Sequence, residues 1–117
     1  MGKDGIKKIS KYEVKPVQDP CGLLRELYSS DHLSIAHDTV VGDAKKHTHK
    51  VMEEIYYVED GEGQLLIDKE ILDIKKGDLI PIPKNTVHAL KKLKDTELQV
   101  LVVTYPKYDP HDLILAE

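Results

Sequence analysis

Three side chains that lie close together in the sequence could bind a metal ion. They are the two imidazoles of His47-Thr48-His49 and the carboxylate of Glu54, five residues further on. Alternate residues of a β-strand project from the same face, so the two imidazoles would point toward one position. A carboxylate with two imidazoles is a suitable ligand set for Fe, Mn, Co, Ni or Zn. The histidine pair alone is also typical of an ordinary polar strand face.

The residues around this trio predict how it is brought together. Glu54 begins the run Glu-Ile-Tyr-Tyr-Val, which has the β-branched and aromatic composition of a strand. On that strand Glu54, Tyr56 and Val58 share one face. A turn at Lys50–Met52 would fold the strand back beside the histidine pair. We expect Tyr56 to point inward, either as core filling or as a pocket side chain.

A second segment predicts another histidine at the same place. It contains Gly77, Pro83, Asn85 and His88. Gly77 permits a turn after one strand, and Pro83 with Asn85 favours the next turn, because asparagine tolerates left-handed backbone angles. The strand after that turn would carry His88 and could deliver a third imidazole from a different part of the sheet.

Proline and glycine divide the chain into short β-rich runs. None of them shows a sustained helical period, and short strands at a spacing of about 8–12 residues favour an all-β sandwich or barrel. We expect a hairpin turn at Asp60-Gly61 and a second turn over Lys75–Asp78. The expected strands are Leu23–Tyr28, Leu33–Val41, Glu54–Val58, Gln64–Ile67, Ile71–Ile74, Leu79–Ile82, Val87–Leu90 and Leu98–Tyr105.

Length and composition restrict the class of protein. The 117 residues suffice for one domain, and 40% apolar with 32% charged residues indicate a folded globular chain. The net charge of −4 argues against a nucleic-acid partner, and no apolar run approaches the ~20 residues of a membrane span. The single cysteine, Cys21, excludes an intrachain disulfide framework, and MGKDGIKKISKYEV has no apolar signal-type stretch. We therefore expect a cytoplasmic protein.

The two histidine-bearing segments together resemble the two motifs of the cupin superfamily. The motifs are Gly42-(x4)-His47-x-His49-(x4)-Glu54-(x6)-Gly61 and Gly77-(x5)-Pro83-x-Asn85-(x2)-His88. This resemblance implies an all-β double-stranded β-helix, the jelly roll of the RmlC-like cupin barrel. It also implies that His47, His49, Glu54 and His88 are the ligands of one divalent metal per chain, with Fe, Mn, Zn, Ni or Co as the ion.

The flanking segments resemble small single-domain cupins of the mannose-6-phosphate-isomerase-like, cupin_2 conserved-barrel type. That resemblance concerns the fold and is weak evidence for sugar isomerisation. The segments are Leu24–Leu27, Glu53–Val58 and Pro106–Asp112.

The motifs differ from the usual cupin pattern at three positions, none of which is a ligand. Glu53 is a rival for the carboxylate, and we prefer Glu54 because its spacing to the next glycine matches the motif. His32, His37 and His111 are expected to cap turns or face solvent. The three departures are the four residues between Gly42 and His47 where five are usual, Asn85 in place of glycine, and Lys92 in place of asparagine.

We expect three parts in the chain and a second copy as partner. The parts are an N-terminal arm over residues 1–20, the barrel over residues 21–105, and a C-terminal tail over residues 106–117 packed on the barrel. Small cupins commonly form homodimers through strand exchange or sheet packing. The apolar residues of the arm that could supply an exchanged strand are Ile6, Ile9, Tyr12 and Val14.

Two functions from different classes follow from the predicted site. The first is a metalloenzyme with an open three-histidine, one-glutamate site that acts on a small hydroxylated or carboxylated molecule. Dioxygenases, isomerases and decarboxylases are the enzyme classes that the family implies. The alternative is a non-catalytic metal- or sugar-binding module, for example with four protein ligands closing a tetrahedral zinc site. The pocket wall depends on register, because either Leu65 with Ile67 or Gln64 with Leu66 faces inward.

Overall fold

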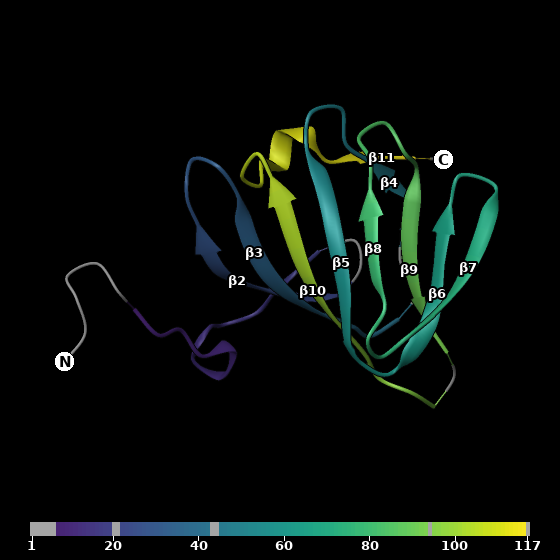
Figure 1. Cartoon of the computed structure of the whole chain (residues 1–117), viewed down its shortest axis with the longest axis horizontal. Coiled ribbons are helices and arrows are strands. Elements are labelled where there is room, and N and C mark those ends of the chain that lie inside the picture. Colours follow the sequence, from purple (N-terminus) through teal and green to yellow (C-terminus); the bar gives the residue numbers. More distant parts are fainter. Residues whose placement is uncertain (1–6, 20–21, 43–44, 94, 117) are drawn as a thin grey trace.

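Two antiparallel β-sheets face each other, which confirms the predicted all-β class (Figure 1). This computed structural model describes residues 7–19, 22–42, 45–93 and 95–116, so Ile6 and Cys21 lie outside the described ranges. Within those ranges the helical structure consists of two single-turn 3-10 helices, η1 (Lys11–Glu13) and η2 (Pro110–Asp112). Neither of these two helices is long and apolar enough to cross a membrane.

The larger sheet has six strands in the order β1-β2-β3-β10-β5-β8. Its central strand β10 is antiparallel to both β3 and β5 and joins the two halves of the sheet. The five longer strands were all predicted, whereas the two-residue β1 was not. The bounds are β1 (Val17–Gln18), β2 (Leu23–Ser29), β3 (Ser34–Val40), β5 (Glu53–Asp60), β8 (Leu79–Ile82) and β10 (Leu98–Tyr105).

The smaller sheet has five strands in the order β11-β4-β9-β6-β7. β6, β7 and β9 were predicted, and β4 lies on the strand expected at the histidine pair, although it ends at Thr48. β11 has two residues and is too short for a periodic pattern. The bounds are β4 (His47–Thr48), β6 (Glu62–Ile67), β7 (Glu70–Lys75), β9 (His88–Lys92) and β11 (Ile114–Leu115).

Two predicted turns carry the chain from one sheet to the other. β5 and β6 flank Asp60-Gly61, and β7 and β8 flank the turn at Lys75–Asp78, but neither pair shares a sheet. The expected hairpin at Asp60-Gly61 is therefore wrong, because β5 pairs with β10 and β8, and β6 pairs with β7 and β9. Gly61 adopts a φ of 87°, and a Cβ atom there would collide with the carbonyl oxygen of Glu97.

Aliphatic side chains and one tyrosine fill the space between the sheets. Leu65 is fully buried and Ile67 packs against the core, so this pair faces inward. Gln64 points away from the core, where its amide donates to Asp73 at 3.3 Å. Burying this apolar layer is the main force that holds the two sheets together. The other buried core residues are Val40, Tyr56, Val58, Ile74, Ile82, Leu90, Leu98, Val100 and Val102.

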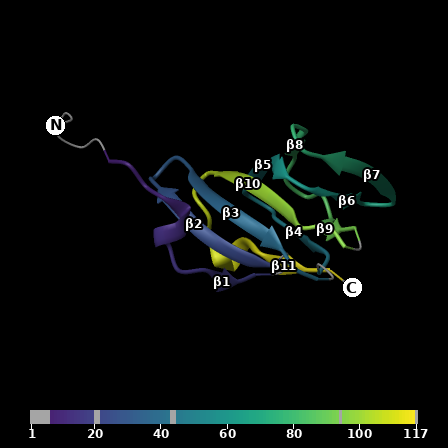
Figure 2. The same cartoon turned by 90° about the horizontal axis from the view of Figure 1, so that it is seen from below.

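The described part of the N-terminal arm packs on the outer face of the larger sheet, beside β2 (Figure 2). Lys11 Nζ donates to Glu59 Oε1 at 2.9 Å and to Gln99 Oε1 at 3.3 Å. Beneath it His37 is only 1% exposed, so the expectation that His37 faces solvent is wrong. Burial and the Lys11 charge lower the pKa of His37. Exchange of this arm between two copies stays a prediction.

Candidate metal centre

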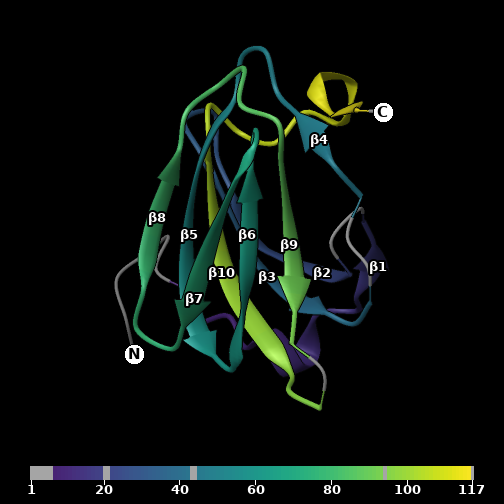
Figure 3. The same cartoon turned by 90° about the vertical axis from the view of Figure 1, so that its right-hand side faces the viewer.

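Both sheets contribute to one cluster at the end of the barrel. β4 supplies His47, which is paired in register with His88 of β9, and His49 follows directly after β4. Glu54 lies in β5, which belongs to the opposite sheet. The turn over residues 50–52 therefore carries the chain across the barrel (Figure 3). The expected turn does bring Glu54 beside the histidines, but from the opposite sheet, because the neighbours of β4 within its own sheet are β9 and β11.

The four predicted side chains form a compact, buried cluster. Their potential ligand atoms all lie within 4.8 Å of one another. Glu54 Oε1 lies 3.0 Å from His49 Nε2 and 2.9 Å from His88 Nε2. Relative exposure ranges from 1% for His88 to 7% for Glu54. Metal–nitrogen bonds of about 2.1 Å place bound ligand atoms roughly 3–4 Å apart. The cluster could therefore hold a metal ion after small side-chain movements.

Backbone carbonyls orient all three imidazoles. A carbonyl oxygen can only accept, so each Nδ1 carries a proton and each Nε2 is left to face the cluster, where it binds a metal when deprotonated or donates to a carboxylate when protonated. Among the described residues, the Nε2 of His49 is one of the buried polar atoms without a hydrogen-bond partner. The three contacts are His47 Nδ1 to Lys45 O at 3.0 Å, His49 Nδ1 to Asp112 O at 2.8 Å, and His88 Nδ1 to Thr86 O at 2.8 Å.

Asp112 holds the turn that separates the histidine pair from Glu54. Its Oδ1 accepts from the backbone N–H of Lys50 at 2.8 Å. Its Oδ2 accepts from the backbone N–H groups of Val51 at 3.0 Å and Met52 at 2.8 Å. Burial acts to raise the pKa of Asp112, but these hydrogen bonds lower it overall. Asp112 is thus ionised, and its carboxylate accepts the backbone hydrogen bonds of a turn that lies outside both sheets.

Burial and neighbouring charges set the protonation of the cluster. Burial acts to raise the pKa of Glu54, but the adjacent imidazoles of His49 and His88 lower it to about 2. Burial and the neighbouring His88 lower the pKa of His47 to about 4. Burial acts to lower the pKa of His49, whereas Glu54 raises it above its ordinary value. Glu54 is therefore ionised and His47 neutral at neutral pH, and these are the forms that bind metals.

A narrow cavity adjoins the cluster, with about 30 Å³ of room for a water-sized molecule. Its lining includes His47, His49 and Glu54, inward-facing residues of β2, β3 and β10, and Tyr108 from the C-terminal tail. Tyr56 is buried, belongs to the core and also lines the cavity. Its hydroxyl donates to Glu54 Oε1 at 3.4 Å.

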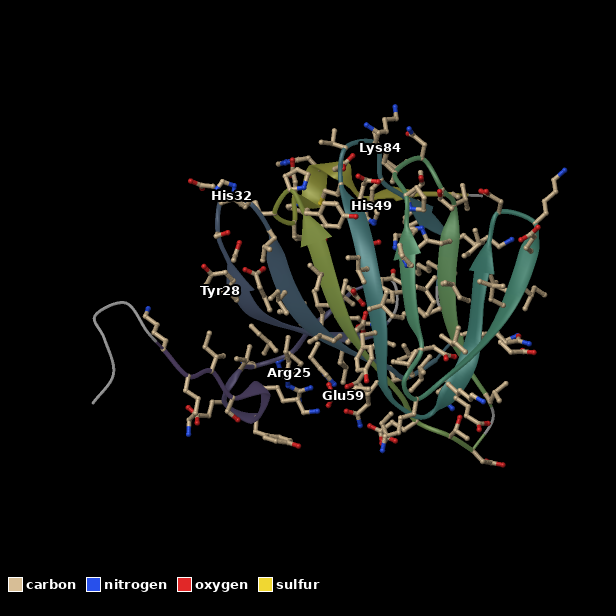
Figure 4. All side chains as sticks on the ribbon, in the orientation of Figure 1. Arg25, Tyr28, His32, His49, Glu59 and Lys84 are labelled. Atoms are coloured by element: carbon tan, nitrogen blue, oxygen red, sulfur yellow. The ribbon has the colours of Figure 1, made fainter. Side chains whose placement is uncertain are left out.

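The other candidate residues lie away from this cluster. Glu53 is partly exposed and points to the opposite face of β5 from Glu54, which supports the choice of Glu54. His32 lies on the loop between β2 and β3, apart from His49 (Figure 4). The side chain of His111 is 95% exposed. The expected solvent-facing role is therefore confirmed for His32 and His111.

Several residues of the site were not predicted from the sequence. Asp38 had a detectable signal, because it alternates with Ala36 and Val40 on the inward face of a predicted strand. Asp112 had no local signal, since its contacts lie some 60 positions earlier in the chain. The residues missed are Asp19, Asp38, Tyr108 and Asp112.

Comparison with known proteins identifies the family. The Cupin_2 family, described as a cupin domain, matches residues 38–104, which is more than half of the chain. This chain is a cupin. A curated relative from Methanocaldococcus jannaschii, the uncharacterized protein MJ1618, is 38% identical over 71 residues. The aligned part is 61% of this cupin and 57% of the relative, so this cupin spans little more than half of that protein.

Solved structures share the fold of this cupin over nearly its whole length. A protein from Planctomyces limnophilus has a TM-score of 0.84 at 23% identity, covering 95% of this chain and 97% of its own. Pac13 of Streptomyces, a nucleoside dehydratase, has a TM-score of 0.80 at 17% identity, covering 96% and 92%. The polyketide cyclase RemF of Streptomyces resistomycificus has a TM-score of 0.80 at 20% identity, covering 96% and 86%. The expected double-stranded β-helix is therefore confirmed.

Proposed function

We propose that this cupin binds one divalent transition metal through His47, His49, Glu54 and His88. We further propose that the bound metal serves as the centre of an enzyme that acts on a small hydroxylated or carboxylated molecule. The cavity beside the cluster leads to the proposed metal ligands.

The arrangement of the Nε2 atoms is the single observation that carries the metal proposal. Each Nδ1 proton is held by a backbone carbonyl, so three Nε2 atoms and one ionised carboxylate converge on a common position. Such a concentration of electron pairs in a buried place needs a cation or a proton among them. A divalent ion with three neutral imidazoles and one carboxylate has a local net charge of about +1.

The number of open coordination positions on the bound metal decides between a catalytic site and a non-catalytic binding site. Octahedral Fe or Mn would keep two positions for water or substrate beside these four ligands, and such an ion could polarise a carbonyl or bind an enediolate. The surrounding chain would orient the substrate, with Tyr56 bonded to Glu54 and Tyr108 across the cavity. Two of the solved structures with this fold, Pac13 and RemF, are enzymes, which supports a catalytic role.

The second candidate function is a non-catalytic metal- or sugar-binding module. The observation that favours it is the number of protein ligands, because four are enough to complete the tetrahedral shell of structural zinc. A zinc ion held in that way would have no open position for a substrate.

Elemental analysis of the untagged protein, purified without added metal or chelator, tests the proposal. We expect about one equivalent of transition metal per chain. Fe or Mn would support the open site and direct a screen toward oxygen-dependent and isomerase reactions. Tightly held zinc with no turnover would support the binding module. Absence of metal, with none taken up on reconstitution, would contradict the metal proposal and leave the cupin fold unaffected.

A further inference from the structure

Asp38 is a carboxyl group buried in the wall of the metal-site cavity. It lies on β3 two positions from Ala36, on the face that points toward the smaller sheet, and both residues line the cavity. Only 2% of Asp38 is exposed. An acidic side chain is rarely buried to this extent without a partner.

The carboxyl group of Asp19 lies next to that of Asp38 in the cavity wall. A hydrogen bond joins the two carboxyl groups, and Asp19 also lines the cavity. The turn that carries Asp19 is held against β3 by a close backbone approach, because a Cβ atom on Gly22 would collide with the carbonyl oxygen of Thr39. The Oδ1 of Asp19 accepts from the backbone N–H of Gly22 at 2.7 Å. The pair is therefore positioned by the backbone.

One oxygen of Asp38 remains without a partner. Its Oδ1 is buried and accepts no hydrogen bond from the residues that the structure describes. Burial and the adjacent Asp19 raise the pKa of Asp38 to about 9, so Asp38 is a neutral carboxylic acid at neutral pH. Asp38 thus has one buried acceptor oxygen in the wall of the cavity. A buried acceptor gains most from a ligand that brings a hydrogen-bond donor.

The charges of the cavity wall restrict what that ligand can be. Its lining includes the carboxyl groups of Asp19, Glu26, Asp38 and Glu54, and no lysine or arginine is among the described residues that form it. In the part of the cavity away from the metal ligands, a carboxylate or phosphate would find no basic side chain and would be repelled by Asp19 and Glu26. A hydroxyl group can donate to Asp38 Oδ1 without carrying any charge.

We propose that Asp38, supported by Asp19, is a binding subsite for hydroxyl groups of a neutral polyhydroxylated molecule, such as a sugar or polyol. This inference deepens the proposed function and rests on it, because the molecule held at the subsite would occupy the cavity that leads to the metal ligands. It restricts the group that lies at Asp38 to a hydroxyl and disfavours a carboxylate at that place. Asp38 is a substrate-binding residue in this scheme, and Asp19 positions it.

Ligand-observed NMR titration of the purified full chain tests this subsite. The probes are glucose, galactose and mannose, the uronic acid of each, and glucosamine as a cationic analogue. We expect at least one neutral sugar to bind more tightly than its own uronic acid and than glucosamine. Asp38→Ala should weaken that binding about tenfold, because one buried hydrogen bond is lost. Asp38→Asn, which keeps a neutral acceptor at the same place, should retain most of it.

Two controls separate a local effect from unfolding. Asp73→Ala removes an exposed carboxylate on β7 and should bind like the wild type. Metal content and melting temperature are measured on every sample. A wild type that lacks metal but binds a neutral sugar through Asp38 would contradict the proposed metal function and support the subsite.

Three results would overturn the inference. They are binding of no neutral sugar, tighter binding of the uronic acids or of glucosamine, and wild-type affinity in a folded Asp38→Ala variant. A water molecule filling the place beside Oδ1, with sugar affinity unchanged in the variant, would show that the acceptor is satisfied by solvent only.

Discussion

Asp112 orients His49 with its main chain while its side chain holds the turn that follows His49. The carbonyl oxygen of Asp112 lies 2.8 Å from His49 Nδ1, and its carboxylate accepts from the three backbone N–H groups of residues 50–52. A residue of the C-terminal tail therefore sets both the direction of one candidate ligand and the path of the chain toward Glu54. Hydrogen bonds that orient a metal ligand in this way usually affect metal affinity as well as stability.

Asp112→Asn should weaken both the fold and the metal site. An amide cannot replace the charged acceptor of three backbone N–H groups, so we expect a loss of about 2 kcal/mol in the free energy of unfolding. That corresponds to a melting temperature lower by about 8 °C. Metal affinity should fall about 10- to 100-fold. Calorimetry and competition with a metal chelator measure the two effects.

Asp109→Asn is the matched control for Asp112→Asn. Asp109 also accepts a backbone hydrogen bond in the tail, from the N–H of His111 at 2.9 Å, but its side chain is exposed. We expect wild-type metal affinity in this variant. Equal affinities in the two variants would contradict the role assigned to Asp112.

Two adjacent glutamates provide a test of the ligand assignment. Glu54→Gln should weaken metal binding more than about 100-fold, because a charged ligand is lost. Glu53→Gln should have no such effect, since its side chain points to the other face of the same strand. His49→Ala should behave like Glu54→Gln. The measurement is metal stoichiometry after dialysis, and unchanged stoichiometry in both Glu54→Gln and His49→Ala would refute the assignment.

Metal removal should lower the melting temperature. An ion that binds only the native state stabilises it by about 4 kcal/mol when its free concentration is 1,000 times Kd. Scanning calorimetry before and after verified removal, followed by reconstitution, measures the difference. A melting temperature that is unchanged by removal would count against a tightly held ion in the folded protein.

Metal affinity should increase with pH. A proton and a metal compete for the Nε2 of His49, whose pKa is raised above 6.5 by Glu54. Acidification through that pKa therefore releases the ion, and affinity should rise about tenfold per pH unit until His49 has lost its proton. His47, whose pKa is lowered to about 4, should not limit binding in this range. Chelator competition at several pH values measures the slope, and an affinity independent of pH would contradict the expectation.

We propose that two copies of the chain associate through the outer face of the larger sheet. Tyr57 and Leu79 are neighbours in register there and are 42% and 59% exposed. Light scattering should give about twice the chain mass of 13.3 kDa. Leu79→Glu should favour the monomer, whereas Ile71→Glu on β7 of the smaller sheet should not. A monomeric wild type at micromolar concentration would exclude a stable dimer.

Local patterns in the sequence were enough for the strands and for the types of candidate ligand. Turn residues and β-rich runs predicted all eight longer strands, because the side-chain alternation of a strand is a property of consecutive residues. The same alternation placed His47 and His49 toward one position and separated Glu54 from Glu53. The left-handed turn expected at Asn85 is present with a φ of 64°.

Only the tertiary structure decided how these local pieces meet. The pairing of β4 with β9, rather than with β5, means that Glu54 reaches the histidines from the opposite sheet. The contact of Asp112 with His49 spans 63 positions, and the pair of Asp19 and Asp38 joins a turn to a strand. Such contacts depend on which strands become neighbours and where each sheet ends. Pairing between distant parts of the chain sets which strands are neighbours and where each sheet ends. The alternation of side chains within a single strand contains no information about either property.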